Sequence, residues 1–338
     1  MVTEHSCDIV VVGAGPVGLF QVFQAGMLGM TCHVVDTLDA IGGQCVALYP
    51  EKPIYDIPAH PEIGAEALIE RLAEQAAPFA PVYHLGQQVT ALSGKAGAMT
   101  VATSAGTQIA CKAVVIAAGC GAFGPNRPPL EGLEAYEASG GVAYLVTRRE
   151  GHRGKRIVIA GGGDSALDWV LALADIADRI MVVHRRDKFR AAPESVRRMG
   201  ELVAAGKVEL VTPYQLHGLA GDGGRLKEVI VADLDGGERR LAADLLLPFY
   251  GLRMELGPIA HWGLNIEKNL ITVDPATCAT STPGIHAVGD IVHYPGKLKL
   301  ILCGFSEAAM AAHAIYDLVF PDKPLHFEYS TTRGVPGA

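Results

Sequence analysis

Short apolar runs that alternate with glycine turns and apolar helical stretches are the main pattern of this chain. Residues 8–12 are rich in β-branched side chains, as expected for a strand buried on both faces; a glycine turn, a helical stretch and a second apolar strand at 32–35 follow. The same order returns over residues 156–183. A strand–turn–helix–strand unit that occurs twice predicts an α/β fold with two Rossmann-like dinucleotide-binding domains.

The first glycine turn has the G-x-G-x-x-G pattern, formed by Gly13, Gly15 and Gly18. The first glycine permits the tight turn, the second lets backbone N–H groups approach a pyrophosphate, and the third lets helix and strand pack closely. Asp36 ends the second strand, where an acid accepts hydrogen bonds from a ribose. The first unit is therefore predicted to bind a dinucleotide with an unphosphorylated ribose, FAD or NAD.

The second glycine turn has the G-x-G-x-x-A pattern, and its distance to the end of the next strand equals that in the first unit. In place of the acid, this unit has a histidine and two arginines. An acid there repels a 2′-phosphate, whereas paired arginines bind one through charge-assisted hydrogen bonds. The alternative, a solvated surface cluster, does not account for the shared register. The residues predicted to bind NADPH or NADP⁺ are Gly161, Gly163, Asp164, Ser165, His184, Arg185, Arg186 and Arg190.

Other periodic stretches and changes of composition divide the chain further. An amphipathic helix is expected over residues 61–79. A second helix is expected over 306–320, with Ser306 as its N-cap and Pro321 after its end. Strands are expected around residues 89–92, 98–103, 108–110 and 113–119, and residues 242–247 are apolar apart from Asp244. Segments rich in Gly and Pro follow residue 119 and residue 247, and they predict domain boundaries after residues 121 and 247.

Composition narrows the range of partners. The chain has 338 residues and a formal net charge of −8, which argues against general nucleic-acid binding. Residues 148–198 nevertheless carry an excess of Lys and Arg, which suits a phosphate and an acidic protein partner. The cysteines and histidines lack metal-type spacing, so no metal is expected. We expect no membrane span, no secretory signal and a cytoplasmic location.

Several strings together resemble one family. They are the Gly-Gln-Cys-Val-Ala-Leu-Tyr-Pro-Glu-Lys string at residues 43–52, the second glycine turn, the His-Arg-Arg-Asp-Lys-Phe-Arg string at 184–190 and the Thr-Pro-Gly-Ile-His-Ala-Val-Gly-Asp string at 282–290. The chain resembles the thioredoxin-reductase-like ferredoxin–NADP⁺ reductases, which have the two-dinucleotide flavoprotein reductase fold. The resemblance implies an FAD domain from residues 1–121 and 248–338, an NADPH domain at 122–247, and a homodimer.

The resemblance also implies a site and a reaction. NADPH would pass a hydride to flavin N5, and the reduced FAD would give single electrons to ferredoxin or flavodoxin. Tyr49 would stack on one face of the isoalloxazine and Tyr329 would cover the other, in the same or the partner subunit. The residues implied in FAD binding, besides the first glycine turn, are Asp36, Gln44, Tyr49, Val89, Phe123, Asp290 and Thr331.

Two other functions remain open at this stage. One is an NADPH-dependent flavin reductase of a small acceptor such as a quinone, and the other is a non-catalytic FAD-binding module, which an intact second nucleotide site disfavours. Thiol–disulfide exchange is disfavoured because residues 143–149 contain no C-x-x-C and Cys45 has no second cysteine five residues later. Cys45 is expected to be a small packed residue near the flavin.

Overall fold

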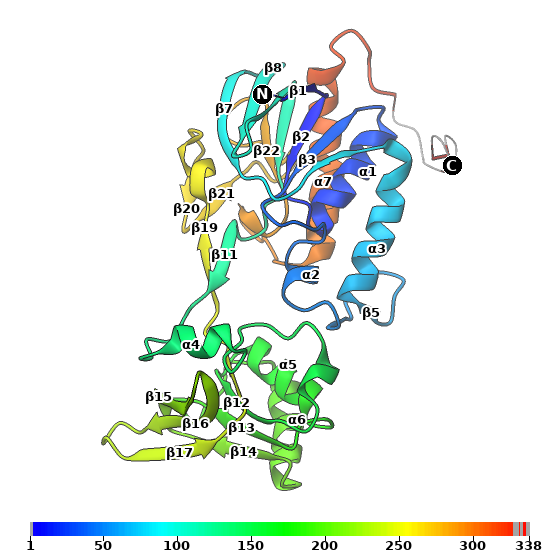
Figure 1. Cartoon of the computed structure of the whole chain (residues 1–338). Coiled ribbons are helices and arrows are strands. Elements are labelled where there is room, and N and C mark those ends of the chain that lie inside the picture. Colours follow the sequence, from blue (N-terminus) through cyan, green and yellow to red (C-terminus); the bar gives the residue numbers. More distant parts are fainter. Residues whose placement is uncertain (1–2, 327–330, 332–333, 336–338) are drawn as a thin grey trace. The chain divides into compact units, whose positions relative to one another are not determined.

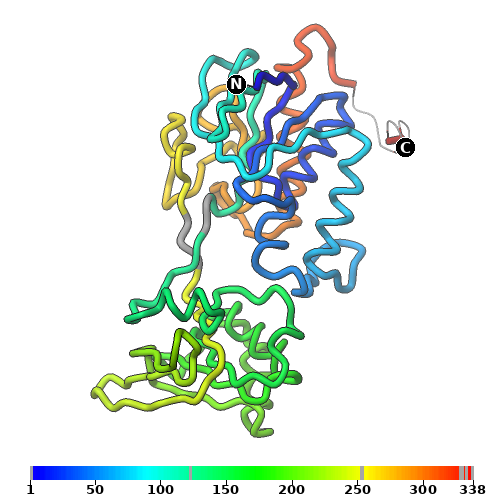
Figure 2. Tube along the Cα trace, in the orientation of Figure 1, coloured from blue at the N-terminus to red at the C-terminus, as the bar shows by residue number. Residues whose placement is uncertain are grey.

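The protein consists of two compact units. The computed structural model describes residues 3–326, 331, 334 and 335, without the side chains of residues 122, 123 and 252–254. One unit contains the residues up to 123 and from 254 onward, and the other contains residues 124–253. The blue and red ends of the chain thus build the first unit together, and the green middle builds the second (Figure 2). The sequence predicts domain boundaries after residues 121 and 247, and the two units of the structure divide after residues 123 and 253.

A five-stranded parallel sheet is the centre of the first unit. Its order is β22-β10-β2-β3-β6, with the bounds Ile285–Ala287, Ala113–Ile116, Ile9–Val12, Cys32–Val35 and Val82–His84. Every residue of β2, β3 and β10 is buried, which confirms the apolar runs as strands covered on both faces.

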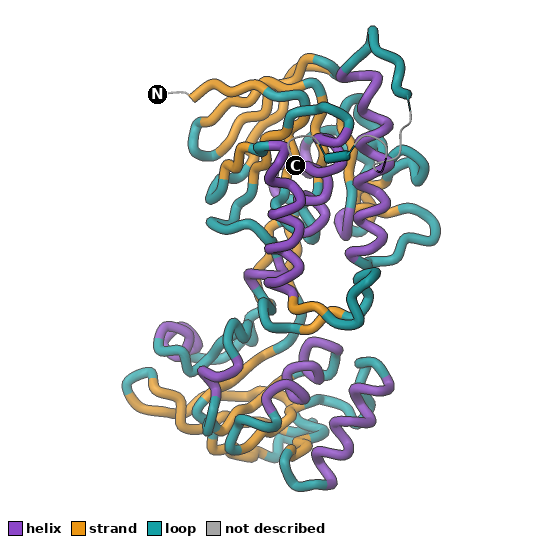
Figure 3. The backbone as a smooth tube through the Cα atoms, turned by 90° about the vertical axis from the view of Figure 1, so that its right-hand side faces the viewer, coloured by secondary structure: helices purple, strands orange, loops and turns teal. Residues whose placement is uncertain are grey.

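Different layers cover the two faces of this sheet. Helices α1 (Pro16–Met27), α3 (Ala65–Ala76) and α7 (Ile301–Val319) lie together on one side (Figures 1 and 3). Val11 and Val34 face α1 and α7 in one core, while Val10, Val12 and Val114 face a second core on the opposite side. The second core is closed by side chains of β8 (Ala98–Thr103), β9 (Thr107–Cys111) and residues 256–292.

Smaller elements complete the first unit. A four-stranded sheet has the order β1-β9-β8-β7, where β1 is Thr3–Ser6 and β7 is Val89–Lys95. A three-stranded sheet pairs β20 (Ile266–Glu267), β21 (Leu270–Thr272) and β23 (Val292–His293), and a short ribbon pairs β4 (Pro53–Ile54) with β5 (Ile63–Gly64). The remaining helical segments are α2 (Gln44–Ala47), η1 (Ala77–Phe79), η3 (Gly257–His261) and η4 (Gly289–Ile291).

Helix α7 corrects one expectation from the sequence. It begins at Ile301, so Ser306 lies inside the helix and is not its N-cap. The N-cap is Leu300, whose side chain makes no capping hydrogen bond. The early start is stabilised by packing instead, because Ile301 and Phe305 contact the core that α3 contributes to. The first N–H groups of α7 therefore have no side-chain cap.

The second unit repeats the parallel pattern on a smaller scale. Its sheet has the order β14-β13-β12-β18, with the bounds Val208–Val211, Arg179–Val183, Arg156–Ala160 and Leu245–Pro248. The unit also contains helices α4 (Leu133–Ala138), α5 (Asp164–Leu173) and α6 (Pro193–Ala204), the turn η2 (Arg149–His152) and an antiparallel sheet of β15 (Gln215–Asp222), β16 (Arg225–Ala232) and β17 (Glu238–Ala242). Strands β11 (Ala122–Pro125) and β19 (Leu252–Glu255) pair where the chain passes between the units.

A buried histidine of β22, His286, should make the folded protein less stable at acidic pH. His286 is 6% exposed, and its Nδ1 has no hydrogen-bond partner within the described residues. Burial lowers its pKa from 6.5 to about 4, so the unfolded chain binds more protons between these values. Stability from the neutral ring is complete above the unfolded pKa and is lost, by roughly 3 kcal/mol, as the pH falls towards the folded pKa.

We therefore expect His286→Gln to lose less unfolding free energy than the wild type between about pH 7 and about pH 4.5. Urea unfolding at the two pH values measures the difference. An equal loss in both proteins would contradict the prediction.

Candidate functional site

The first glycine turn joins β2 to α1, and two of its three glycines have no room for a side chain. Gly13 has φ +112°, and a Cβ on it would lie 2.4 Å from the carbonyl oxygen of Ala117. A Cβ on Gly18 would lie 1.9 Å from the carbonyl oxygen of Gly13. Gly15 differs, because a Cβ there would meet nothing within 4 Å. Gly13 and Gly18 thus serve the packing of the turn, while Gly15 faces open space.

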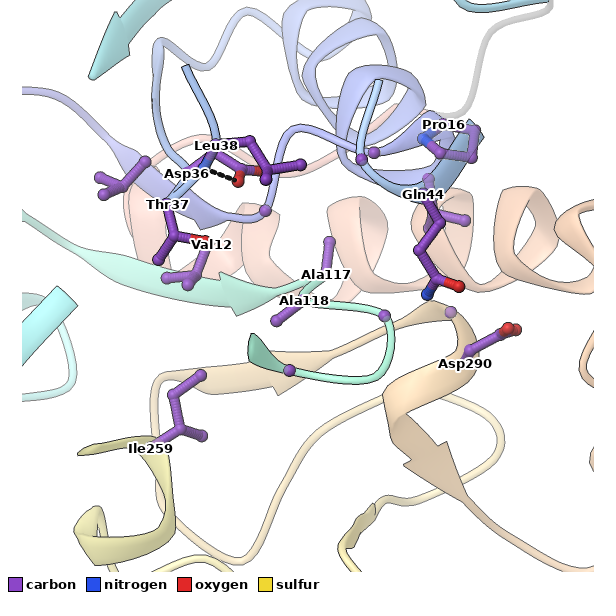
Figure 4. Close-up of a pocket in the computed structure, with 18 of the residues that line it drawn as sticks. Val12, Pro16, Asp36, Thr37, Leu38, Gln44, Ala117, Ala118, Ile259 and Asp290 are labelled. Carbon is purple, nitrogen blue, oxygen red and sulfur yellow. Dashed lines mark hydrogen bonds between the residues drawn. The ribbon is translucent and has the colours of Figure 1, made fainter. Parts of the chain in front are cut away.

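Asp36 connects the end of β3 to this turn. Its Oδ2 accepts a hydrogen bond from the backbone N–H of Ala14 at 2.6 Å. Its Oδ1 accepts one from the backbone N–H of Leu38 at 2.9 Å (Figure 4). Burial raises the pKa of Asp36, and these backbone hydrogen bonds oppose the rise. The carboxylate is held at the carboxyl edge of the parallel sheet, where dinucleotides bind in open α/β folds.

A cavity lies over this edge of the sheet. Its lining includes Gly13 and Gly15, Asp36, Gln44 and Tyr49 from the segment after β3, Val89 from β7, and Asp290 from η4 (Figure 4). The space free of protein atoms is about 1130 Å³, including the part open to solvent. Residues 13, 15, 36, 44, 49, 89 and 290, which the sequence predicted for one site, are therefore brought around one cavity.

The other expected residues have different placements. Gly18 supports the turn without lining the cavity. Thr331 is exposed and does not line it either. Tyr329 and the side chain of Phe123 lie outside the described residues. Their predicted roles remain predictions.

The cavity also has lining residues that the sequence did not single out. Thr37 and Leu38 follow Asp36, and Ile301 at the start of α7 reaches the same space. The start of α7 thus lies at the cavity, although it begins earlier than expected. Glu307, which lies further along α7, was not singled out from the sequence either. It is the only Asp, Glu, Lys or Arg of residues 300–316, and an isolated charge in an apolar helix is a signal that could have identified it.

The thiols near Tyr49 are poor nucleophiles. Burial raises the pKa of Cys45 to about 11, although the neighbouring Tyr49 hydroxyl opposes the rise. Burial also raises the pKa of Cys120, whose Sγ lies 3.1 Å from Nε2 of Gln44. Both thiols are therefore protonated at neutral pH, which does not suit thiol–disulfide exchange.

The glycine turn and Asp36 of the first unit fit a dinucleotide whose ribose carries no 2′-phosphate. The N-cap of α1 is Gly15, which makes no side-chain capping bond, so the first N–H groups of the helix are available to an anion. Pro16 at the first helical position lacks an N–H and leaves the remaining donors in place. Asp36 supplies the acceptor that ribose hydroxyls require.

The second glycine turn, in the other unit, has related geometry. Gly161 has φ +150°, and a Cβ on it would lie 2.7 Å from the carbonyl oxygen of Phe249. A Cβ on Gly162 would lie 2.5 Å from the ring of His184, while Gly163 has open space. The N–H of Arg190 donates to the carbonyl of Gly162 at 2.7 Å, so the segment after β13 folds back onto the turn.

Asp164 and Ser165 are exposed in the first turn of α5. The Asp164 carboxylate accepts a hydrogen bond from the N–H of Ala192 at 2.8 Å and ties the segment after β13 to the helix. Burial, followed by the charges of the adjacent arginines, lowers the pKa of His184, so its ring is neutral at pH 7. The segment is therefore fixed at both ends and presents its arginines from a defined position.

The arginines of this segment have no carboxylate partner among the described residues. Arg185, Arg186 and Arg190 are exposed and form no ion pair with a described residue. On α6, by contrast, Arg197 binds Glu194 at 2.6 Å and Glu201 at 2.5 Å. An unpaired arginine cluster beside a glycine turn fits a phosphate group of a dinucleotide.

The described part of the chain contains neither a cluster of metal ligands nor a helix that could span a membrane. No group of three or more His, Cys, Asp or Glu residues there could hold a metal ion. Over the same residues, no helix combines the length and the apolarity needed to cross a bilayer.

The chain belongs to the pyridine nucleotide-disulphide oxidoreductase family, whose model matches residues 7–314. It is similar to Ferredoxin–NADP reductase of Paramagnetospirillum magneticum, with 62% identity over 334 residues that cover 98% of this chain and 99% of the relative. The protein of the same name from Acidiphilium cryptum is 62% identical over 337 residues, 100% of this chain and 99% of that relative.

Solved structures agree on the fold. Thioredoxin reductase of Lactococcus lactis has a TM-score of 0.79 and 24% identity, covering 93% of this chain and 99% of its own. Thioredoxin reductase of T. acidophilum has a TM-score of 0.79 and 22% identity with the same coverage. The family resemblance inferred from the sequence and the predicted fold, two Rossmann-like domains, are confirmed.

The contrast between Gly15 and Gly18 gives a prediction. Gly18→Ala would force apart the turn and α1, so we expect it to lower the stability of the apoprotein by about 1–3 kcal/mol. Gly15→Ala has room in the protein but places a methyl group where the pyrophosphate is expected. It should leave apoprotein stability within about 1 kcal/mol of wild type and weaken FAD binding at least about tenfold.

Urea unfolding of the apoproteins and FAD titration followed by fluorescence measure the two effects. Tight FAD binding by Gly15→Ala would show that the pyrophosphate does not lie against this turn.

Proposed function

We propose that this protein is an FAD-dependent ferredoxin–NADP⁺ reductase that transfers electrons between NADPH and ferredoxin. The observation that carries the proposal is the pair of glycine turns whose following strands end in opposite charges, Asp36 in one unit and Arg185 with Arg186 in the other. The curated relatives at 62% identity, which span nearly the whole chain, carry the name of this activity.

The residues of the first unit would hold FAD, with residues 1–121 and 248–338 as its domain. The Asp36 carboxylate accepts hydrogen bonds from the ribose, and the free N–H groups after Gly15 bind the pyrophosphate. Gln44, Val89 and Asp290 would surround the rest of the cofactor, and the family resemblance adds Phe123 and Thr331 to them. When bound, FAD accepts two electrons from NADPH and releases them one at a time.

Two tyrosines would cover the flavin ring. Tyr49 lies in the cavity, and burial raises the pKa of its hydroxyl, so the ring is neutral and suited to stacking. Tyr329 would cover the opposite face and must move to admit the nicotinamide. Its side chain would come from the same subunit or from the partner of a homodimer.

The second unit, residues 122–247, would hold NADPH. Its turn at Gly161 and Gly163 and the start of α5 at Asp164 and Ser165 face the pyrophosphate, and the arginines bind the 2′-phosphate. The neutral His184 ring packs against the turn and supports the segment that carries them. The cationic segment also suits acidic one-electron carriers, flavodoxin as well as ferredoxin. Seven free cysteines suit the reducing environment of the cytoplasm.

The test of the function is reduction of cytochrome c by NADPH in the presence and absence of ferredoxin. We expect purified protein to contain FAD, and the rate to depend on added ferredoxin and to fall as salt rises from about 0.02 M to about 0.3 M. Equal rates without ferredoxin, combined with rapid reduction of a quinone, would instead support the small-acceptor flavin reductase.

The cluster at the second turn predicts nucleotide specificity. Arg185→Ala and Arg186→Ala should each lower kcat/KM for NADPH about 10- to 100-fold, because each loses a charge-assisted hydrogen bond, and should leave NADH almost unaffected. Arg197→Ala is the matched control, since it removes an equal charge from the same unit but one already bound by carboxylates. Ferricyanide reduction measures these values without ferredoxin. Equal effects on the two nucleotides would exclude a 2′-phosphate contact.

A further inference from the structure

One of the two carboxylates of helix α7 is deeply buried. Glu307 is 1% exposed and packs between α7 and the turn η4 that carries Asp290. Burying a charged side chain costs free energy unless it is paired and hydrogen-bonded. The contacts of the Glu307 carboxylate therefore show which part of the structure the buried charge holds in place.

Three donors satisfy the two oxygens of Glu307. Oε2 accepts a hydrogen bond from the backbone N–H of Gly289 at 2.7 Å. Oε1 accepts one from the hydroxyl of Tyr294 at 2.7 Å and pairs with Nζ of Lys297 at 2.5 Å. The Lys297 side chain is itself only 5% exposed. The network is thus electrically balanced and separated from solvent.

The bond to Gly289 holds a turn that requires glycine directly before Asp290. Gly289 has φ +83°, a conformation that favours glycine. Helix α7 approaches this turn closely at Gly304, where a Cβ would lie 3.3 Å from the Cα of Gly289. Glu307 lies three residues further along α7 and fixes the N–H of the same turn. Gly289 and Asp290 both line the cavity, so the network reaches the cavity wall through one backbone group.

We propose that Glu307 is a positioning residue for the flavin: its carboxylate fixes the Gly289 turn so that Asp290 faces FAD, and Lys297 supplies the balancing charge. This inference rests on the proposed function, because it assigns FAD to the cavity. A purely structural ion pair is a poorer explanation, because buried pairs contribute little net stability compared with apolar side chains of similar size.

Two double variants test the hydrogen bond without leaving an unpaired buried charge. Lys297→Met with Glu307→Gln keeps an acceptor for the Gly289 N–H, whereas Lys297→Met with Glu307→Leu removes it. Leaving that N–H unsatisfied should make the leucine double bind FAD about tenfold more weakly than the glutamine double. The visible circular dichroism of bound FAD should also change in the leucine double, because the flavin surroundings shift.

Asp244→Asn is the matched control. It disrupts the bidentate ion pair with Arg156 in the second unit, where the two bonds measure 3.0 and 2.7 Å. It should change FAD affinity less than about twofold. If the leucine double does not fold, Glu307→Asp replaces it: the ion pair keeps its charges, the carboxylate withdraws from Gly289, and FAD binding should weaken at least about fivefold relative to wild type.

A ratio of FAD dissociation constants above about fivefold between the two doubles, with Asp244→Asn unchanged, supports the proposal. If the wild type binds FAD but the ratio between the two doubles is smaller, this inference is overturned and the proposed function stands. A wild type that binds no FAD overturns the proposed function itself, and the inference with it.

Discussion

The close approach of the first glycine turn to the end of β10 is the constraint on which the site depends. Gly13 and Gly18 can carry no side chain, because each Cβ would enter a backbone carbonyl. The turn therefore lies directly over the parallel sheet, and the N–H of Ala14 reaches the Asp36 carboxylate at 2.6 Å. One steric condition places a helix N-terminus and a carboxylate acceptor side by side, which a dinucleotide with a bare ribose requires.

The two units share this backbone design but end in opposite electrostatics. In the first, the strand after the glycine turn delivers a carboxylate that the protein backbone holds on both oxygens. In the second, the equivalent strand delivers His184 and exposed arginines without carboxylate partners among the described residues. Elsewhere in that unit Arg156 and Arg197 are paired. Pairing thus distinguishes arginines that stabilise the surface from those available to a ligand.

Local patterns were sufficient for the buried parallel strands and the glycine turns, whereas Gln44, Tyr49, Val89 and Asp290 in the cavity lining were implied by the family resemblance. Buried parallel strands are continuous apolar runs, and turns of this kind have fixed glycine spacing, so both can be read from neighbouring residues. The start of α7 could not be predicted in this way, because packing of Ile301 and Phe305 replaced a polar cap at Ser306. Nor could the partners of Glu307, because Gly289 and Lys297 reach it only through the tertiary fold.

The fold neighbours include proteins named thioredoxin reductase and bacillithiol disulfide reductase, but the thiols at the cavity of this protein do not suit disulfide exchange. The flavin-binding half of the fold has no need of thiols, since hydride transfer uses the cofactor. A dithiol acceptor needs two cysteines close together with one of them a thiolate. Here burial raises the pKa values of both Cys45 and Cys120, and the Cys120 sulfur lies at hydrogen-bond distance from Gln44. Electrons would therefore leave the flavin for an external acceptor without passing through a thiol pair beside Tyr49.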